Sequence, residues 1–551
     1  MATTHEVFNQ APPLADLDTA ADPALIEALH REGAGWAQEQ VHAAGRLAGS
    51  ERAREWGRLA NDYSPVLRTH DRVGQRIDEV EFHPAWHELL NAAAALGLTA
   101  AAWREDRAGA HVARAATAYA WTQVEAGHMC PVDMTYAVVA ALRRAPELAA
   151  AYEPLLASRE YESGSQPPLA KRGLLAGMSM TEKQGGSDVQ SNTSRAVPAA
   201  DGTYRLTGHK WFTSAPMCDL FLVLAHAPGG LSCFLLPRIL PDGSRNRMHL
   251  QRLKDKLGNR ANASAEVEYH DAVVWLVGQE GHGLPTILEM VNVSRLMIAG
   301  QSAAGMRAAT VAALHHASHR RAFGIYLRDQ PLMRNVLADL ALESEAALTT
   351  VMRLAGATDR ALAGDHTEAA FRRLGGAVGK YWICKRAAPH AAEALECLGG
   401  NGYVEDSGMP RLYREAPLNS IWEGSGNVAA LDVLRVLQRE PDAVEAFLAE
   451  LDAARGADHS YDAALARLHG EVAKATQADA ADFAVPNGAR RLAERMAMTL
   501  QASLLLRYAP PAVGDSFCAT RLGGDWGHAF GTLPEGAETE HIIDRAQIKT
   551  V

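Results

Sequence analysis

The chain has 551 residues, of which 48% are hydrophobic and 22% are charged. This composition is typical of a globular protein with several domains, and it excludes a mainly disordered chain. The formal net charge of −11 excludes an overall basic surface for nucleic acid, although a local basic patch stays compatible with it.

The first residues, MATTHEVFNQAPPL, contain neither a basic nor an apolar stretch, so we expect no signal peptide. No apolar run approaches the ~20 residues of a membrane span, so we expect no membrane partner. The six cysteines are scattered without a CxxC pair, which is typical of reduced, buried thiols in a cytoplasmic protein. His315 and His319 are four residues apart in a helical pattern, but no carboxylate or cysteine pattern completes a site, so we expect no metal.

Residues 1–175 are predicted to form a helical domain, because apolar residues recur at helical spacing between residues 20 and 160. A Pro-Pro pair at residue 167 marks a break near its end. Over residues 176–282, short apolar runs alternate with turn signals, which predicts a small β domain. Within it, the sequence PGG at residues 228–230 separates two apolar runs and predicts a hairpin.

Helical spacing resumes over residues 283–440, with three long patterns at 284–322, 331–364 and 367–398. Long helices with short joints predict a helix bundle. Residues 441–551 continue as helix and then end in a tail rich in Gly, Pro and Asp with little periodicity. The chain is therefore predicted to be mainly α with a central β domain. It contains neither a P-loop nor a strand–GxGxxG–helix pattern, which argues against both of those nucleotide sites.

Two motifs lie in the predicted β domain. The first, MSMTEKQGGSD, begins at Met178, and its glycines let the backbone approach a heterocycle or a phosphate that hydroxyls and amides can bind. The second, GHKWFTS, places Trp211 close to Thr213, and such a pair can pack on a flat ring and hydrogen-bond its edge. Taken alone, the first motif is also compatible with a solvated turn and the second with a core tryptophan.

Three further motifs lie in the predicted bundle. RRAFG begins at Arg320, and arginine suits a pyrophosphate, although a basic helix end explains it equally. LGGNGY begins at Leu398, directly after a long helical pattern. IWEGSGN contains Glu423 between an aromatic residue and a glycine, which can raise the pKa of the carboxyl and open it to a substrate. Taken alone, Glu423 also fits a loop residue in solvent.

In this order and spacing, the five motifs resemble those of the acyl-CoA dehydrogenase superfamily over residues 50–440. Segments such as REGAGW, FHPAW and RLKDKLGNR resemble the AidB-like, adaptive-response branch over nearly the whole chain. The resemblance implies a helical domain, a central β-barrel domain, a four-helix bundle and an additional C-terminal helical domain. It also implies FAD as the cofactor, held between the β domain and the bundle, and a homotetramer in which two subunits share each FAD.

The resemblance also implies a site, carried over residue by residue. The cofactor-binding residues are Met178, Met180, Thr181, Gly186, Ser187, Trp211, Thr213, Arg320, Phe323, Gln330, Glu396, Gly399, Gly400, Ser425 and Asn427. Glu423 matches the base that takes the α-proton of an acyl-CoA thioester, and Arg295 is expected to support its loop. Some members carry the base on a bundle helix instead, but Ser294 holds that position here.

Three site positions depart from the common pattern of the family. Gln330 lies one residue closer to Phe323 than usual, Glu396 stands where many members have Gln, and Ser425 replaces the commoner Thr. These departures leave the contact of Gln330 less well defined and place a carboxylate near the cofactor.

AidB-like proteins are associated with protection against DNA alkylation and with binding of double-stranded DNA through the fourth domain. Residues 441–551 hold 10 Lys or Arg and 16 Asp or Glu residues, a net charge of −6, which opposes phosphate binding. The candidate DNA-binding residues are Arg435, Arg490, Arg491, Arg495 and Arg521. Solvated helix arginines are the alternative interpretation of the same residues.

Overall fold

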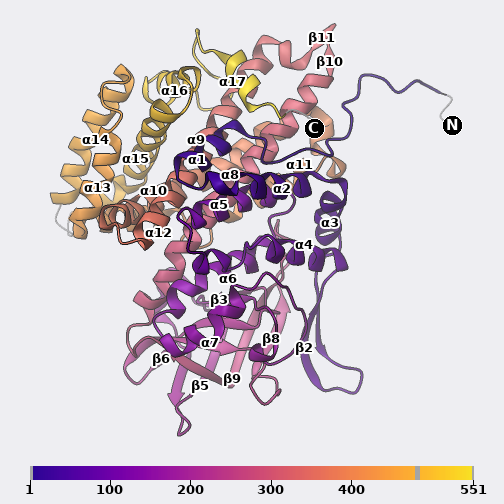
Figure 1. The fold of residues 1–551 in the computed structure, drawn as a ribbon, viewed down its shortest axis with the longest axis vertical. Coiled ribbons are helices and arrows are strands. Elements are labelled where there is room, and N and C mark those ends of the chain that lie inside the picture. Colours follow the sequence, from indigo (N-terminus) through magenta and orange to yellow (C-terminus); the bar gives the residue numbers. More distant parts are fainter. Residues whose placement is uncertain (1–3, 478–483, 549–551) are drawn as a thin grey trace. The chain divides into compact units, whose positions relative to one another are not determined.

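A computed structural model describes residues 4–477 and 484–548 of the chain. The chain folds into two compact units, and each draws on several parts of the sequence. The bundle unit contains Met1–Ser50, His111–Gln123 and Ile298–Val551. The barrel unit contains Glu51–Ala110 and Val124–Met297. Figure 1 shows their helices and strands.

The barrel unit is built on a closed sheet of five strands. These are β4 (Arg195–Pro198), β5 (Tyr204–Ser214), β6 (Leu220–Ala227), β7 (Gly230–Pro237) and β9 (Ser264–Val277). The ring closes because β4 joins β5 to β6, β9 joins β5 to β7, and β7 pairs with β6. Two further strands, β3 (Ala176–Ser179) and β8 (Met248–Leu253), pair with β6 and β9. The predicted β-barrel domain is thus confirmed.

The predicted hairpin at residues 228–230 is also confirmed, because β6 and β7 pair antiparallel up to Ala227 and Gly230. Gly230 has a φ of +116°, a conformation that favours glycine. Nearly every side chain of the two strands is buried. This burial on both faces agrees with their sequences, which are continuous apolar runs rather than alternating patterns.

The remaining elements of the barrel unit come mostly from the N-terminal part of the chain. Its helices are α3 (Glu51–Asp62), α4 (Pro84–Ala95), α6 (Met129–Leu142) and α7 (Pro146–Leu156). A hairpin of β1 (Val66–His70) and β2 (Arg76–Glu81) interrupts this helical region, where the sequence analysis predicted helices only. The missed signal is a pair of alternating runs, VLRTH and RIDEVE, around a turn with a glycine.

Three long helices form the centre of the bundle unit. They are α8 (Gly283–His319), which begins in the barrel unit, α9 (Pro331–Leu362) and α10 (His366–Glu396). Their bounds agree within three residues with the three predicted helical patterns. Asp365 caps α10 by accepting a hydrogen bond from the backbone N–H of Glu368, which explains the sharp turn after α9.

Shorter elements pack around these helices. They are α1 (Pro23–Arg31), α2 (Gln38–Gly49), α5 (Ala110–Thr122), the hairpin β10 (Arg321–Ala322) with β11 (Ile325–Tyr326), α11 (Met409–Glu415) and α12 (Gly426–Arg439). The additional helical region is present as α13 (Pro441–Asp452), α14 (His459–Gln477) and α15 (Ala484–Tyr508).

The C-terminal tail is more ordered than its composition predicts. It contains α16 (Pro511–Phe517), a π-helical turn (Cys518–Leu522) and α17 (Thr539–Ala546). The backbone N–H of Gly531 donates to Asp339, and that of Leu533 donates to Asn335, both on α9. Tertiary contacts of this kind replace the helical periodicity that the tail lacks.

The sequence analysis also made predictions about the cysteines and about membrane-spanning helices. All six cysteines are buried and carry free thiols, as the sequence analysis predicted. Within the described residues, no helix combines the length and the apolarity that a membrane crossing requires.

Candidate functional site

The two motifs of the β domain lie side by side in the barrel unit. The backbone N–H of Trp211 on β5 donates to the carbonyl oxygen of Thr181 at 2.8 Å. The hydroxyls of Ser179 and Thr213 are both buried and hydrogen-bond each other. Met178, Met180 and Thr181 are therefore held next to Trp211 and Thr213, and their contact with a cofactor stays a prediction.

A buried ion pair fixes the loop that carries the first motif. Glu182 and Lys210 are both buried, and the Lys210 Nζ lies 2.9 Å from a Glu182 carboxylate oxygen and 3.2 Å from the Met180 carbonyl oxygen. Although burial opposes it, Lys210 and the backbone N–H of Thr193 hold the pKa of Glu182 well below its usual range. Burial lowers the pKa of Lys210 to about 8. Sequence reasoning did not single out either residue, although both stand inside the motifs.

The turn that follows Glu182 exposes its residues to solvent. Gly185 has a φ of +145°, and Gly186, Ser187 and their neighbours are exposed. A Cβ atom on Gly186 would lie 2.4 Å from the Thr181 Oγ1, so any side chain there would displace Thr181. Exposed backbone amides in such a turn form a concave site for a phosphate group.

Cations surround the indole ring of Trp211. The Lys254 Nζ lies 3.2 Å from the ring centroid, and the Arg252 guanidinium lies 5.8 Å from it. Arg252 lies in β8 and Lys254 directly follows it, both within the basic segment RLKDKLGNR. Glu266 pairs with both cations at 2.6 Å, so the ring offers a flat apolar surface beside a compact cluster of charged groups.

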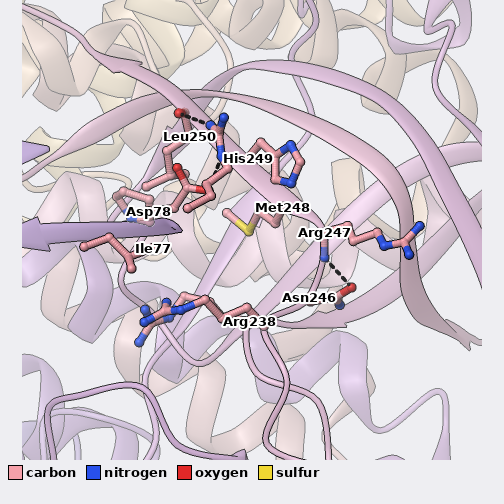
Figure 2. A pocket seen from close by; sticks show the side chains of 11 residues that line it. Ile77, Asp78, Arg238, Asn246, Arg247, Met248, His249 and Leu250 are labelled. Carbon is pink, nitrogen blue, oxygen red and sulfur yellow. Dashed lines mark hydrogen bonds and ion pairs between the residues drawn. The ribbon is translucent and has the colours of Figure 1, made fainter. Parts of the chain in front are cut away.

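A second feature of the barrel unit is a small pocket of about 90 Å³, lined by none of the predicted site residues. It lies between the β1–β2 hairpin and β8, and Figure 2 shows the side chains of Ile77, Asp78 and Met248 around it. Arg76 on β2 forms an ion pair with Asp78 at 2.7 Å and donates to the Leu250 carbonyl oxygen at 2.8 Å. These contacts join the unpredicted hairpin to the barrel.

In the bundle unit, the short hairpin β10–β11 carries the third motif. The Arg320 guanidinium donates to the Asn9 carbonyl oxygen at 2.7 Å. The side chain of Asn9 donates to the Arg321 carbonyl oxygen at 3.0 Å and accepts from its N–H at 2.7 Å. Gln330 donates to the backbone of the same hairpin at 3.1 Å. At the tip, Phe323 has a φ of +52° and is 100% exposed. The hairpin thus brings Arg320, Phe323 and Gln330 together.

The fourth motif follows the end of α10. Glu396 is its last residue and is exposed, as are Gly399 and Gly400 in the 3-10 turn that follows. Gly399 has a φ of +61°, which turns the chain away from the helix axis. Burial and the neighbouring Glu396 carboxylate raise the pKa of Glu393, so this corner of the molecule holds two neighbouring carboxyl groups.

Glu423 lies in a turn before α12 and adopts the left-handed conformation, with a φ of +55°. The turn is held on both sides. The Trp422 indole N–H donates to Asn419 at 3.1 Å, and Asn419 donates to the Ser302 hydroxyl on α8 at 3.1 Å. On the other side, the buried Lys380 of α10 donates to the Gly424 carbonyl oxygen. A non-glycine residue in this conformation costs about 1–3 kcal/mol and persists only where its surroundings fix it.

Sequence models of known families match three consecutive segments of the chain. Residues 9–163 match the N-terminal domain of the adaptive response protein AidB. Residues 177–272 match the middle domain of acyl-CoA dehydrogenases, and residues 281–438 match their C-terminal domain. AidB of Escherichia coli, which is named as an acyl-CoA dehydrogenase, is 46% identical over 525 residues, 94% of each chain.

The chain belongs to the acyl-CoA dehydrogenase family. Two solved structures share its fold over most of the chain. The structure of Caenorhabditis elegans ACDH-11 in complex with C11-CoA is 28% identical, with a TM-score of 0.85, and covers 99% of this chain and 93% of that one. The apo form of Bd2924 is 28% identical, with a TM-score of 0.83, and covers 92% and 100%.

Members of the acyl-CoA dehydrogenase family are FAD-dependent oxidoreductases, and FAD is the cofactor of this enzyme. The described residues fit that cofactor in the barrel unit. The open turn at Gly186 suits a pyrophosphate because a Cβ atom there would collide with Thr181. The Trp211 ring suits a flat heterocycle.

The structure places the remaining predicted residues as follows. Ser294 and Arg295 are buried on α8 in the barrel unit, whereas Glu423 lies in the bundle unit, so the support of its loop by Arg295 stays a prediction. Ser425 precedes α12, and Asn427 lies in its first turn.

The five candidate DNA-binding arginines have different surroundings. Arg435 pairs with Asp432, and Arg495 pairs with Glu471. Arg490 donates to Asn427, and Arg491 is exposed. Arg521 is 5% exposed and pairs with Asp339 and Glu343, which removes it from any surface that contacts a phosphate.

Proposed function

We propose that this enzyme is an AidB-like acyl-CoA dehydrogenase in which Glu423 takes the α-proton of an acyl-CoA thioester. The observation that supports this most is the left-handed backbone of Glu423, held from α8 through Asn419 and from α10 through Lys380. Strain that the surroundings maintain at a carboxylate is typical of a catalytic position.

The chemistry needs a base in a fixed place, because the α-proton of a thioester is only weakly acidic. Glu423 is half-buried beside Trp422, which limits its contact with water. When bound, FAD supplies the two-electron oxidation that removes the β-hydride. In this proposal, Trp211 packs on the ring system, Thr213 hydrogen-bonds its edge, and Gly186 and Ser187 bind the pyrophosphate.

The adenine half of FAD is proposed to be bound by a second subunit of a homotetramer. Phe323 at the tip of the β10–β11 hairpin is fully exposed, and Tyr403, beyond Gly399 and Gly400, is 83% exposed. Large aromatic side chains that protrude singly from a rigid hairpin or turn are favoured at contacts between proteins. Arg320, held by Asn9, would provide the charge for the phosphates.

Anaerobic titration of the purified enzyme with acyl-CoAs tests this function. We expect the visible absorbance of the bound flavin to bleach with at least one of a series of short, branched and medium-chain substrates. The series includes C11-CoA because the ACDH-11 structure contains it. A protein that retains FAD but is bleached by no acyl-CoA would contradict the proposed reaction, and a protein without FAD would contradict the site.

Association with duplex DNA in a cytoplasmic alkylation response is a second candidate function. The match of residues 9–163 to the adaptive response domain supports it, as does the exposure of Arg491 on α15. Replacing Arg435, Arg491 and Arg495 together by glutamine is expected to weaken duplex binding and to reduce its salt dependence. Fluorescence anisotropy at two salt concentrations measures both. Absence of binding by the wild type at low salt would exclude this role.

A further inference from the structure

The C-terminal helical domain reaches the start of α12, where two of the predicted FAD-binding residues lie. Arg490 on α15 donates from its Nη1 to the Asn427 side-chain oxygen at 3.2 Å. It also donates from its Nε to the Tyr381 hydroxyl on α10 at 3.4 Å. One side chain of the additional domain thus joins α15 to both α10 and α12.

The same bond fixes the orientation of the Asn427 amide. An arginine only donates hydrogen bonds, so the atom of Asn427 that faces it must be the oxygen. The amide nitrogen of Asn427 is therefore directed away from Arg490, and Asn427 is exposed. In that orientation Asn427 presents a donor, which suits an oxygen-rich ligand such as a phosphate.

A second cation lies beside the same turn. A Cβ atom on Gly426 would lie 2.6 Å from the Lys385 Cε and 3.0 Å from its Nζ. The end of the Lys385 side chain therefore packs against the backbone of Gly426, the residue before Asn427. Burial and the charge of Arg490 lower the pKa of Lys385. On α15, Glu494 interacts electrostatically with Arg490. Two cations close to the first turn of a helix favour an anionic ligand.

We propose that Arg490 is a positioning residue of the flavin site, which orients Asn427 toward the FAD. This inference rests on the proposed function, in which Asn427 contacts that cofactor. It assigns Arg490 to the cofactor rather than to DNA and gives the C-terminal domain a role in retaining FAD. Arg491 is the next residue of α15 and is exposed, which makes it a matched control.

The test compares the release of FAD from four full-length holoenzymes on dilution. They carry Arg490→Gln, Arg491→Gln, Asn427→Ala, or Arg490→Gln together with Asn427→Ala. Loss of one charged hydrogen bond predicts a FAD dissociation constant about tenfold higher for Arg490→Gln and an unchanged constant for Arg491→Gln. If Arg490 acts through Asn427, the double variant releases FAD no more readily than Asn427→Ala alone.

Equal FAD affinity of Arg490→Gln and Arg491→Gln would overturn the inference, and so would additive effects in the double variant. A change in general stability alone cannot produce the non-additive result. Should Arg490→Gln fail to fold, Arg490→Lys replaces it, because lysine keeps the charge and one donor, and an intermediate dissociation constant is expected. A wild-type enzyme that holds no FAD would overturn the proposed function itself, which is a different outcome from either result above.

Discussion

Glu423→Gln is expected to slow the reduction of bound flavin by acyl-CoA by about 10³-fold while leaving FAD bound. Glutamine keeps the size of the side chain but cannot accept the α-proton. The backbone of the turn is expected to stay in place, because Asn419 bonds the Trp422 indole and Lys380 bonds the Gly424 carbonyl oxygen. Rapid-mixing absorbance under anaerobic conditions measures the rate.

The matched control is Glu445→Gln, an exposed glutamate on α13, which should reduce its flavin at the wild-type rate. If Glu423→Gln were reduced as fast as the control, Glu423 would not be the base. If it lost its FAD, the turn would instead contribute to cofactor binding.

Arg521→Ala is expected to lower the free energy of unfolding by about 3–5 kcal/mol at pH 7. Arg521 lies in a buried cluster with Asp339 at 2.5 Å and Glu343 at 3.0 Å, and Arg386 also contacts Glu343 at 3.1 Å. Removing one cation leaves a buried carboxylate without full compensation. Urea unfolding measures the loss, and Arg455→Ala, which breaks an exposed pair with Asp452 on the protein surface, should change it by less than about 0.5 kcal/mol.

The same cluster predicts how this difference depends on pH. Although burial opposes it, Arg386 and Arg521 lower the pKa of Glu343 to about 2. A carboxyl whose pKa is lower in the folded state stabilises the fold above its unfolded value, about 4.3, and loses that contribution as the pH falls toward 2. The difference between wild type and Arg521→Ala should therefore shrink across this range. A difference that stays constant would indicate lost packing rather than lost charge pairing.

The elements with strong periodicity could be predicted from the sequence. The continuous apolar runs of β6 and β7 and the long helical patterns of α8, α9 and α10 need no distant contact to be recognised. The β1–β2 hairpin was missed because its strands are short and partly exposed, and because a contact 174 residues away, from Arg76 to Leu250, holds it. Tail helices α16 and α17 were missed for a similar reason.

In the candidate site, too, the residues with local sequence signals could be predicted, whereas those that depend on distant contacts could not. Motifs place Trp211, Arg320 and Glu423 because their chemistry is local. Their supports are not local: Asn9 is 311 residues from Arg320, and Lys380 is 44 residues from Gly424. Arg521 illustrates the opposite error, since it was a candidate DNA-binding residue, whereas the fold buries it among carboxylates.

The order in which the two units use the chain has a consequence for synthesis on the ribosome. The bundle unit combines the first fifty residues with the last half of the chain. Arg545 on α17 forms ion pairs with Glu27 on α1 and with Glu345 on α9. The buried face of α1 packs against α9, so it stays uncovered until α9 has been synthesised. Nascent chains of this enzyme should therefore expose the apolar face of α1 to chaperones until α9 emerges from the ribosome.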